Sequence, residues 1–440
     1  MAESDVRVLG TATEFRDVRL DSAFNLAGGA VSGFTVAYVT LEVTDRRGRR
    51  GRGRGASILS VPWSWPRSAS SVSSRDARLR WLVKSLATRS TELEAGDPLV
   101  LCRQLATAAE AQRVEDEGGE PMPALAAALA LGAVDNALHD AWARTANKPV
   151  FAMYTAAHLD ADLGAFLGSD FRGRWPGDFV TAPRTRLPVQ HVVGVGDPLT
   201  ADRDAGAIVR DGPNRQRTLE DWAQSDRFRD VKLKLSGAGA EVDAQRVVDV
   251  HRTMEAQVGA PVRLALDPNE SYPDLAAVLE LIGHLRRISP EAHESVAYME
   301  QPVPRDHIPD PDVLKEIGAH VPVLVDEGLA RVDDLADLAA QGWHGLVVKA
   351  AKGQTSALLC HAFARQHGMF VTIQDLTAPD LALEHSARLA AHLDLSLPAF
   401  ECNSRQYAPG ANSRLVSQRP ELVTVVDGEI TVGEEGPGLR

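Results

Sequence analysis

Cysteine and long apolar segments are nearly absent from this sequence. Only three of its 440 residues are cysteine, and Cys102, Cys360 and Cys402 are too far apart for a paired metal-binding motif. Few, unpaired thiols are typical of a reducing compartment, so we expect a cytoplasmic protein. No run of about 18 apolar residues occurs, and the first residues, MAESDVRVLG, contain no apolar signal region. We therefore expect neither a membrane span nor secretion.

Basic residues are outnumbered by acidic residues, 47 to 60. The net charge is −13 at pH 7, and the one dense basic stretch, RRGRRGRGR at residues 46–54, does not extend over a domain. This balance argues against nucleic acid as a partner. The stretch separates two apolar runs, which predicts a solvated hairpin tip, with a site for an anionic partner as the alternative.

The spacing of apolar residues divides the sequence into regions. Residues 1 to about 60 alternate apolar and polar side chains, and residues from about 75 to 150 repeat apolar side chains at helical spacing. We predict an α+β domain over residues 1–150. Residues 155–186 show little periodicity and are interpreted as an insertion before a second domain.

Beyond this insertion, strands and helices alternate. Eight apolar runs, from LPVQHVVGVG to LPAFECN, are separated by segments with helical spacing. This repeat predicts the α/β class and a (β/α)₈ TIM barrel over residues 151–414. The tail, LVTVVDGEITV, predicts a hairpin that turns at Asp427-Gly428. We expect residues 415–440 to fold back on the first domain and complete it.

Three carboxylates follow successive predicted strands. Asp267 stands in LALDPNE, Glu300 in YMEQP and Asp326 in LVDEG. The carboxyl ends of barrel strands meet at one face, and Mg²⁺ prefers hard carboxylate oxygens, so we predict a Mg²⁺ site made by these three residues. Glu327 is an alternative third ligand, because adjacent strand residues face opposite sides and the last inward position is open.

Lysines precede and follow these acids. Lys232 and Lys234 lie in VKLKL, and Lys349 lies in LVVKAAKG. Lys234 and Lys349 are the candidate base and acid for moving a proton next to a carboxylate, and Lys232, on the same side of its strand, would help to lower the pKa of Lys234. Each residue taken alone is more often a solvated loop residue or a surface ion pair. Their combination favours an active site.

Four further residues are candidate substrate contacts. Asp375 ends the seventh predicted strand and Glu401 the eighth, so both should face the same end of the barrel. Asn269 follows Asp267 in DPNE, and Trp63 in SVPWSWP would line an apolar wall. Hydrogen bonding within the fold is the alternative for the two acids, and packing is the alternative for the tryptophan.

The motifs KLK, DPNE, MEQP, VDEG and KAAKG resemble those of the enolase superfamily. Within it they are similar to the mandelate racemase/muconate lactonizing enzyme family, with the muconate-lactonizing pattern of lysines. The resemblance implies a capping domain on a barrel, Mg²⁺ bound by Asp267, Glu300 and Asp326, and Lys234 and Lys349 on opposite faces of a small-molecule carboxylate. Members of the family commonly form homo-oligomers, so we expect one here.

The reaction implied is removal of the proton α to the carboxylate, through an enediolate, followed by racemisation, epimerisation or cycloisomerisation. Acid-sugar dehydration with the same metal and lysines is the alternative. A barrel that binds a carboxylate without turnover is a third possibility. The Asp-x-Asp signature of dipeptide epimerases is not evident near FECNSRQY, which argues against dipeptide substrates.

Overall fold

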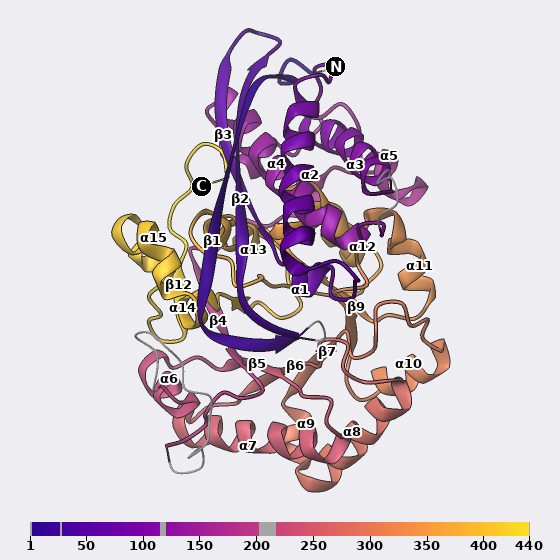
Figure 1. The fold of residues 1–440 in the computed structure, drawn as a ribbon, viewed down its shortest axis with the longest axis vertical. Coiled ribbons are helices and arrows are strands. Elements are labelled where there is room, and N and C mark those ends of the chain that lie inside the picture. Colours follow the sequence, from indigo (N-terminus) through magenta and orange to yellow (C-terminus); the bar gives the residue numbers. More distant parts are fainter. Residues whose placement is uncertain (1, 27–28, 115–119, 202–216, 440) are drawn as a thin grey trace.

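The computed structural model describes residues 2–26, 29–114, 120–201 and 217–439. A long antiparallel sheet with its helices occupies one end of the molecule, and alternating strands and helices occupy the other (Figure 1). No helix within these ranges is long and apolar enough to cross a membrane. The domain boundary at residue 150 stays a prediction.

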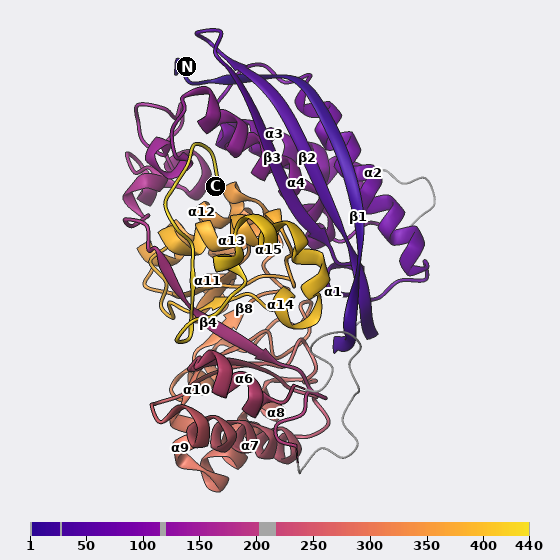
Figure 2. The same ribbon diagram turned by 90° about the vertical axis from the view of Figure 1, so that its left-hand side faces the viewer.

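Three antiparallel strands form the first sheet, in the order β1-β2-β3. Their bounds are Val6–Leu26 (β1), Gly29–Asp45 (β2) and Arg50–Leu59 (β3). The helices that follow are α1 (Val61–Ser64), α2 (Val72–Ser90), α3 (Pro98–Val114) and α4 (Ala124–Thr145). The almost fully buried α4 packs on β2 and β3, and Figure 2 shows the long helices along one face of the sheet. This is the predicted α+β arrangement.

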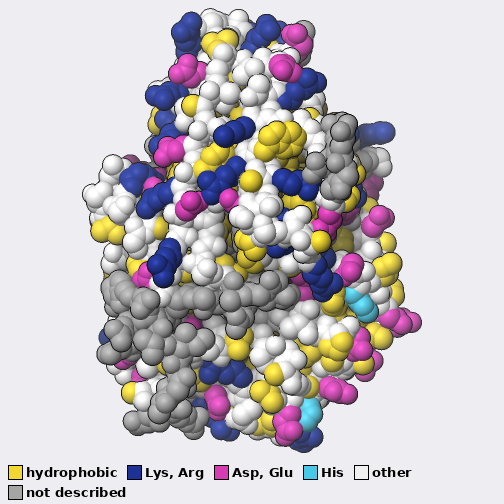
Figure 3. Space-filling model, viewed as in Figure 1, with side chains coloured by type: hydrophobic (Ala, Val, Ile, Leu, Met, Phe, Trp, Pro, Cys, Tyr) yellow, Lys and Arg dark blue, Asp and Glu magenta, His cyan; other side chains and the backbone are white. Residues whose placement is uncertain are grey.

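The arginine-rich stretch is a hairpin tip for only part of its length. Strand β3 begins at Arg50, so half of the predicted tip is strand. Gly51, Gly53 and Gly55 are buried against α4, and a Cβ atom on Gly53 would lie 2.1 Å from the backbone nitrogen of Ala141. Glycine therefore lets α4 lie directly on the strand backbone. The alternating arginines face outward, and Figure 3 shows many Lys and Arg side chains over this end of the molecule.

Helix α4 also joins the first domain to the barrel. Asn136 Nδ2 donates hydrogen bonds to the carbonyl oxygens of Ala56 in β3 (3.1 Å) and Ala350 in the barrel (3.0 Å). Ser57 Oγ donates to the carbonyl oxygen of Ala351 (2.8 Å). Ala350 and Ala351 belong to the short 3₁₀ helix η5 (Ala350–Lys352), which directly follows Lys349. The first domain therefore holds the backbone beside a predicted catalytic residue.

Eight parallel strands form the second sheet, one for each predicted apolar run. They pair in the order β10-β9-β8-β7-β6-β5-β4-β11. Near its ends, the backbone nitrogen of Ser396 donates to the carbonyl oxygen of Val371 (2.9 Å), which helps to close the ring. The predicted TIM barrel with an α+β domain is confirmed. The strands are β4 (Arg186–Val193), β5 (Asp230–Lys234), β6 (Arg263–Asp267), β7 (Val296–Glu300), β8 (Val323–Val325), β9 (Gly345–Val348), β10 (Phe370–Ile373) and β11 (Phe400–Glu401).

Helices cover the outside of these strands. Those between strands are α6 (Leu219–Asp226), α7 (Ala240–Val258), α8 (Leu275–Ile288), α9 (Pro290–Glu294), α10 (Pro311–Gly318), α11 (Leu335–Ala340), α12 (Gln354–Gln366) and α13 (Leu381–His392). Two short helices follow β11, namely α14 (Ser404–Tyr407) and α15 (Ser413–Gln418). Residues 286–295, RRISPEAHES, contain the end of α8 and the whole of α9 and lead into the start of β7, so they lie at the amino end of the strands, away from the predicted site.

The predicted insertion, residues 155–186, contains only short helical turns before β4 begins. They are α5 (Gly164–Leu167), η2 (Ser169–Phe171) and η3 (Pro176–Asp178). Arg103 Nη1 of α3 donates to the carbonyl oxygen of Ala165 (2.5 Å), and the Phe171 ring lies 6.3 Å from the Phe363 ring of α12. The insertion therefore packs between the first domain and the outside of the barrel.

The tail differs in part from the prediction. The hairpin turns where expected, with Asp427 and Gly428 at positive φ, but its second strand β12 (Glu429–Thr431) pairs antiparallel with β4 of the barrel. The expectation that this hairpin folds onto the first domain is wrong. The last residues do reach that domain, because the backbone nitrogen of Leu439 donates to Asp140 Oδ1 of α4 (2.9 Å).

Candidate active site

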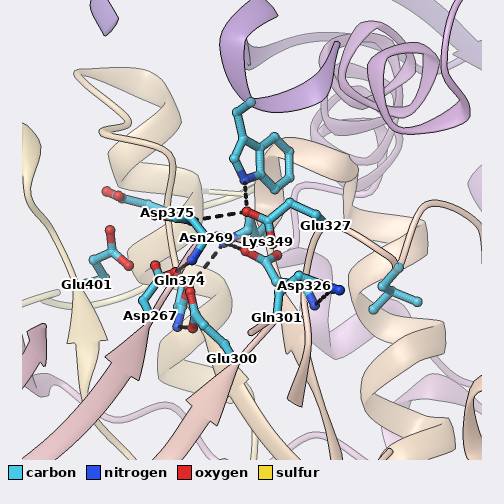
Figure 4. Close-up of polar contacts among 12 residues, drawn as sticks. Asp267, Asn269, Glu300, Gln301, Asp326, Glu327, Lys349, Gln374, Asp375 and Glu401 are labelled. Carbon is cyan, nitrogen blue, oxygen red and sulfur yellow. Dashed lines mark hydrogen bonds and ion pairs between the residues drawn. The ribbon is translucent and has the colours of Figure 1, made fainter. Parts of the chain in front are cut away.

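Three carboxylates lie at neighbouring strand ends of the barrel. Asp267 ends β6, Glu300 ends β7 and Asp326 directly follows β8. Because parallel strands bring their carboxyl ends to one face, residues far apart in the sequence meet here. All three side chains are almost completely buried, and Figure 4 shows them gathered with Lys349 and Gln374.

The predicted lysines lie on the strands that flank these three. Lys232 Nζ in β5 lies 3.0 Å from Asp267 Oδ2 and 2.7 Å from Glu300 Oε1, so it bridges the first two acids. Lys234 Nζ, at the end of β5, forms an ion pair with Asp267. On the other side, Lys349 Nζ after β9 lies 3.0 Å from Asp326 Oδ2. The acids of β6, β7 and β8 therefore lie between two lysine-bearing strands.

Gln374 connects these groups and was missed by the sequence analysis. Its Oε1 accepts from Lys232 Nζ (2.6 Å) and Lys349 Nζ (3.2 Å), and its Nε2 donates to Glu300 and to Tyr298 Oη (3.0 Å). It directly follows β10 and precedes the predicted Asp375. A polar residue at a barrel strand end was the available signal.

The two further predicted acids join the same group. Glu401 Oε2 lies 3.1 Å from Lys232 Nζ. Asp375 Oδ1 accepts from the backbone nitrogen of Thr377 (2.9 Å), and its Oδ2 accepts no hydrogen bond from the residues that the structure describes. Burial, together with the charge of Glu401, holds the pKa of Asp375 well above its usual value.

The two candidates for the third ligand differ in their contacts. Asp326 pairs with Lys349, and its Oδ1 accepts no hydrogen bond within the described ranges. Glu327 Oε1 instead accepts from Trp63 Nε1 (2.9 Å) and from Asn269 Nδ2 (3.1 Å). Burial and the charge of Asp326 raise the pKa of Glu327 to about 7. Asp326 is therefore directed to the lysines and Glu327 to the first domain.

Other charges in the group perturb one another strongly. Burial, with the charge of Asp267, raises the pKa of Glu300 well above its usual value. Burial acts against the charged form of Asp267 too, but Lys232 and Lys234 outweigh it and lower the pKa of this carboxyl. Burial would also lower the pKa of Lys349, yet the carboxylates around it, Asp326 first, raise it. The ammonium forms of Lys232 and Lys349 are thus stabilised by nearby carboxylates.

We call this group the strand-end cluster, and its charges do not balance. Six carboxyl groups lie among four lysines, so acidic groups outnumber basic ones. Hard oxygen donors on adjacent strand ends suit that ion, although Lys232 now bridges two of them and would exchange these contacts on metal binding. The donor set therefore fits Mg²⁺. The members are Asp267, Glu300, Asp326, Glu327, Asp375, Glu401, Lys232, Lys234, Lys349 and Lys352.

A cavity opens over the strand-end cluster, between the barrel and the first domain. Val31 and Phe34 of β2 and Trp63 of α1 contribute its apolar wall. The structure thus brings every predicted site residue to this cavity or, for Glu300, into contact with residues that line it. Predicted residues on the cavity wall are Lys232, Lys234, Asp267, Asn269, Asp326, Lys349, Asp375, Glu401 and Trp63.

A second buried polar group lies where α4 meets α12. Asp135 accepts from Cys102 Sγ (2.7 Å), from Thr355 Oγ1 (2.8 Å) and from the Thr355 backbone nitrogen (2.9 Å). His139 Nε2 contacts Thr355 Oγ1 (2.8 Å), and its Nδ1 contacts Tyr154 Oη (2.9 Å). We call these five residues the interdomain cluster. Their side-chain groups are hydrogen-bonded to one another, so we interpret this cluster as a structural contact that joins the first domain to the barrel.

Comparison with known proteins decides the family. Residues 214–439, just over half of the chain, match the family described as Enolase C-terminal domain-like. The chain belongs to the enolase superfamily. Muconate cycloisomerase 1 of Rhodococcus opacus is 24% identical to this superfamily member over 318 residues, which cover 71% of the chain and 69% of the relative.

Solved structures of the superfamily share the whole fold. The 2-chloromuconate cycloisomerase from Rhodococcus opacus 1CP superposes with a TM-score of 0.62 at 19% identity, over 98% of this chain and 96% of that one. A dipeptide epimerase from Enterococcus faecalis V583, complexed with Mg and the dipeptide L-Leu-L-Tyr, gives 0.64 at 15% identity, over 98% and 99%. These likenesses confirm the predicted fold. The family match and the muconate cycloisomerase relative confirm the predicted mandelate racemase/muconate lactonizing type and an enzyme of the enolase superfamily. The predicted homo-oligomer and cytoplasmic location stay predictions.

Proposed function

We propose that this protein is a Mg²⁺-dependent enzyme that removes the proton α to the carboxylate of a small molecule and returns a proton to racemise, epimerise or cycloisomerise it. The observation that carries this proposal is the order of charged groups along the barrel. Lysines on β5 and β9 flank carboxylates on the three strand ends between them. A substrate carboxylate over the acids would have a lysine on either side.

Asp267, Glu300 and Asp326 are the proposed ligands of Mg²⁺. The bound cation would neutralise negative charge that develops on the substrate carboxylate. The contact between Asp326 and Lys349, and the contacts of Glu327 with Trp63 and Asn269, favour Asp326 over Glu327 as the third ligand. Magnesium in the dipeptide epimerase of the same fold supports the choice of ion.

Lys234 and Lys349 are the proposed acid–base pair. A bound cation would offset the charge of the nearby acids and so favour a neutral lysine amine. This amine takes the α-proton as the C–H bond breaks, and the electron pair moves into the substrate carboxylate as an enediolate. The lysine on the opposite face, as an ammonium, returns a proton to the same carbon. Gln374 accepts from Lys232 and Lys349 and would orient the ammonium groups of these two lysines. Asp375, Glu401, Asn269 and Trp63 are the proposed substrate contacts.

The proposal is tested by exchange of the α-hydrogen. Acid sugars, N-acylamino acids, dipeptides and muconates are incubated with the full-length protein and Mg²⁺ in D₂O, and mass spectrometry follows deuterium uptake. We expect uptake by at least one class. Lys234→Ala and Lys349→Ala should each lower exchange by about 10² to 10⁴, the usual contribution of a general acid or base.

The exposed Lys315→Ala variant on α10 is the matched control and should exchange like the wild type. Uptake without loss of mass supports racemisation, epimerisation or cycloisomerisation. Loss of water from the substrate would favour the dehydratase alternative. Exchange that persists unchanged in both active-site lysine variants would contradict the two-lysine mechanism.

A further inference from the structure

Trp63 of the first domain contacts three strand-end segments of the barrel. Its indole Nε1 donates to Glu327 Oε1 after β8 (2.9 Å), and its carbonyl oxygen accepts from Arg305 Nη2 after β7 (2.9 Å). Its ring centre lies 5.4 Å from Lys349 Nζ, after β9. The side chain is almost completely buried. One residue of the first domain therefore contacts the barrel at three separate strand ends.

The contact with Glu327 continues to the other lysine. Glu327 Oε1 also accepts from Asn269 Nδ2 (3.1 Å), and Asn269 Oδ1 accepts from Lys234 Nζ (2.9 Å). The Asn269 backbone is fixed in turn, because its nitrogen donates to Asp267 Oδ1 (3.0 Å) and its φ is +46°. Hydrogen bonds therefore run without a break from Trp63 through Glu327 and Asn269 to Lys234.

We propose that Trp63 is a positioning residue that orients both acid–base lysines when the first domain lies on the barrel. Its indole nitrogen acts on Lys234 through Glu327 and Asn269, and its ring acts on Lys349 directly. The proposal rests on the roles proposed above for the two lysines. An ammonium held by fixed contacts samples fewer orientations, which favours a reactive alignment.

The two actions of Trp63 can be removed separately. Trp63→Phe keeps a ring beside Lys349 and removes only the indole N–H. Trp63→Ala removes both contacts. Glu327→Ala breaks the path to Lys234 from the barrel side, whereas Glu327→Gln keeps an oxygen that can accept from Trp63 and Asn269. A tryptophan that only fills space would loosen the two lysines together.

Competitive labelling with acetic anhydride measures each lysine without a substrate. The full-length protein is labelled in the presence of Mg²⁺, and mass spectrometry gives the rate at each lysine relative to the exposed Lys315. In Trp63→Phe and Glu327→Ala, Lys234 should react about threefold faster, as expected from losing one weak hydrogen bond, with Lys349 unchanged. In Trp63→Ala both should react faster, and Glu327→Gln should match the wild type.

An equal rise at both lysines in Trp63→Phe, or no rise at Lys234 in Trp63→Phe and Glu327→Ala, overturns the proposal. Should Trp63→Ala not fold, Trp63→Phe and Glu327→Ala still decide the outcome. The labelling pattern does not depend on turnover. Deuterium exchange that persists unchanged in both lysine variants would therefore contradict the proposed function alone, and labelling rates that do not change in the Trp63 and Glu327 variants would contradict only the role of Trp63.

Discussion

Two buried polar clusters lie at the two ends of the segment from Lys349 to Thr355, and they are built in opposite ways. In the interdomain cluster, Asp135 accepts three hydrogen bonds, and His139 uses both ring nitrogens. In the strand-end cluster, Asp375 Oδ2 and Asp326 Oδ1 accept no hydrogen bond from the described part of the chain, and acids outnumber lysines. The hydrogen bonds of the interdomain cluster stabilise the fold. The strand-end cluster holds buried acids without full hydrogen bonding, and a bound cation would stabilise them.

The largest expected change in stability comes from the interdomain cluster. Asp135→Ala leaves the backbone nitrogen of Thr355 and two side-chain donors buried without an acceptor. We expect a loss of about 4 kcal/mol in the free energy of unfolding, measured by urea denaturation. Asp135→Asn keeps one acceptor and should lose about half as much. A loss below about 1 kcal/mol for the alanine variant would mean that the cluster is not the joint described.

Acid should also weaken the fold through a buried histidine that lies outside both clusters. His361 of α12 is fully buried, and burial lowers its pKa to about 4. Since its unfolded pKa is near 6.5, the unfolded chain binds the extra proton first, so stability is complete above about pH 6.5 and falls as the pH drops to about 4. This group should contribute a loss of about 3 kcal/mol, seen in urea titrations at several pH values.

His361→Gln is the matched variant. It cannot take up the proton, so its stability should fall less than that of the wild type between these two pH values. The same fall in both proteins would assign the acid sensitivity to other groups.

Magnesium should stabilise the folded protein by binding to the strand-end cluster and not to the interdomain cluster. At a free concentration of about one hundred times Kd, binding to the folded state adds about 2.7 kcal/mol to the free energy of unfolding. Glu300→Gln removes a proposed ligand and should lose most of this gain, while Asp135→Asn should keep it. Equal stabilisation of wild type and Glu300→Gln would place the ion elsewhere.

The smallest expected effect is a gain in stability. Asp375→Asn keeps an oxygen for the Thr377 nitrogen and removes a buried carboxyl group whose charged form is disfavoured by burial and by Glu401. Without Mg²⁺ at pH 7.5, we expect about 1 kcal/mol more stability in urea. Asp243→Asn is the opposite control, because Asp243 accepts from Ser236, Gly237 and Tyr272 and should lose stability when changed. A loss at both positions would mean that Asp375 is satisfied after all.

Much of the site could be predicted because it follows from strand periodicity. Asp267, Glu300 and Lys234 each end an apolar run, and a parallel barrel must bring such ends to one face. The predicted metal followed from the oxygen donors, and the family from the resemblance of five short motifs. Local pattern and global topology agree in this half of the chain.

The remainder depends on contacts that no local pattern encodes. Trp63 and Glu327 are 264 positions apart, and their hydrogen bond exists only because the first domain docks on the barrel. Gln374 lies beside the predicted Asp375, yet it is Gln374 that contacts Lys232 and Lys349. The tail hairpin was recognised from its turn, but the choice of β4 as its partner depends on which strand it meets in space.

The glycines of β3 have a consequence for how this sequence tolerates change. In a library of substitutions across residues 50–55, the arginines should vary freely, and the glycines should be nearly fixed, although the arginines are the conspicuous feature. Any side chain at Gly53 would push on the backbone of α4, and α4 holds the carbonyl of Ala350 through Asn136. The position of Lys349 thus depends in part on residues that contribute no functional group at all.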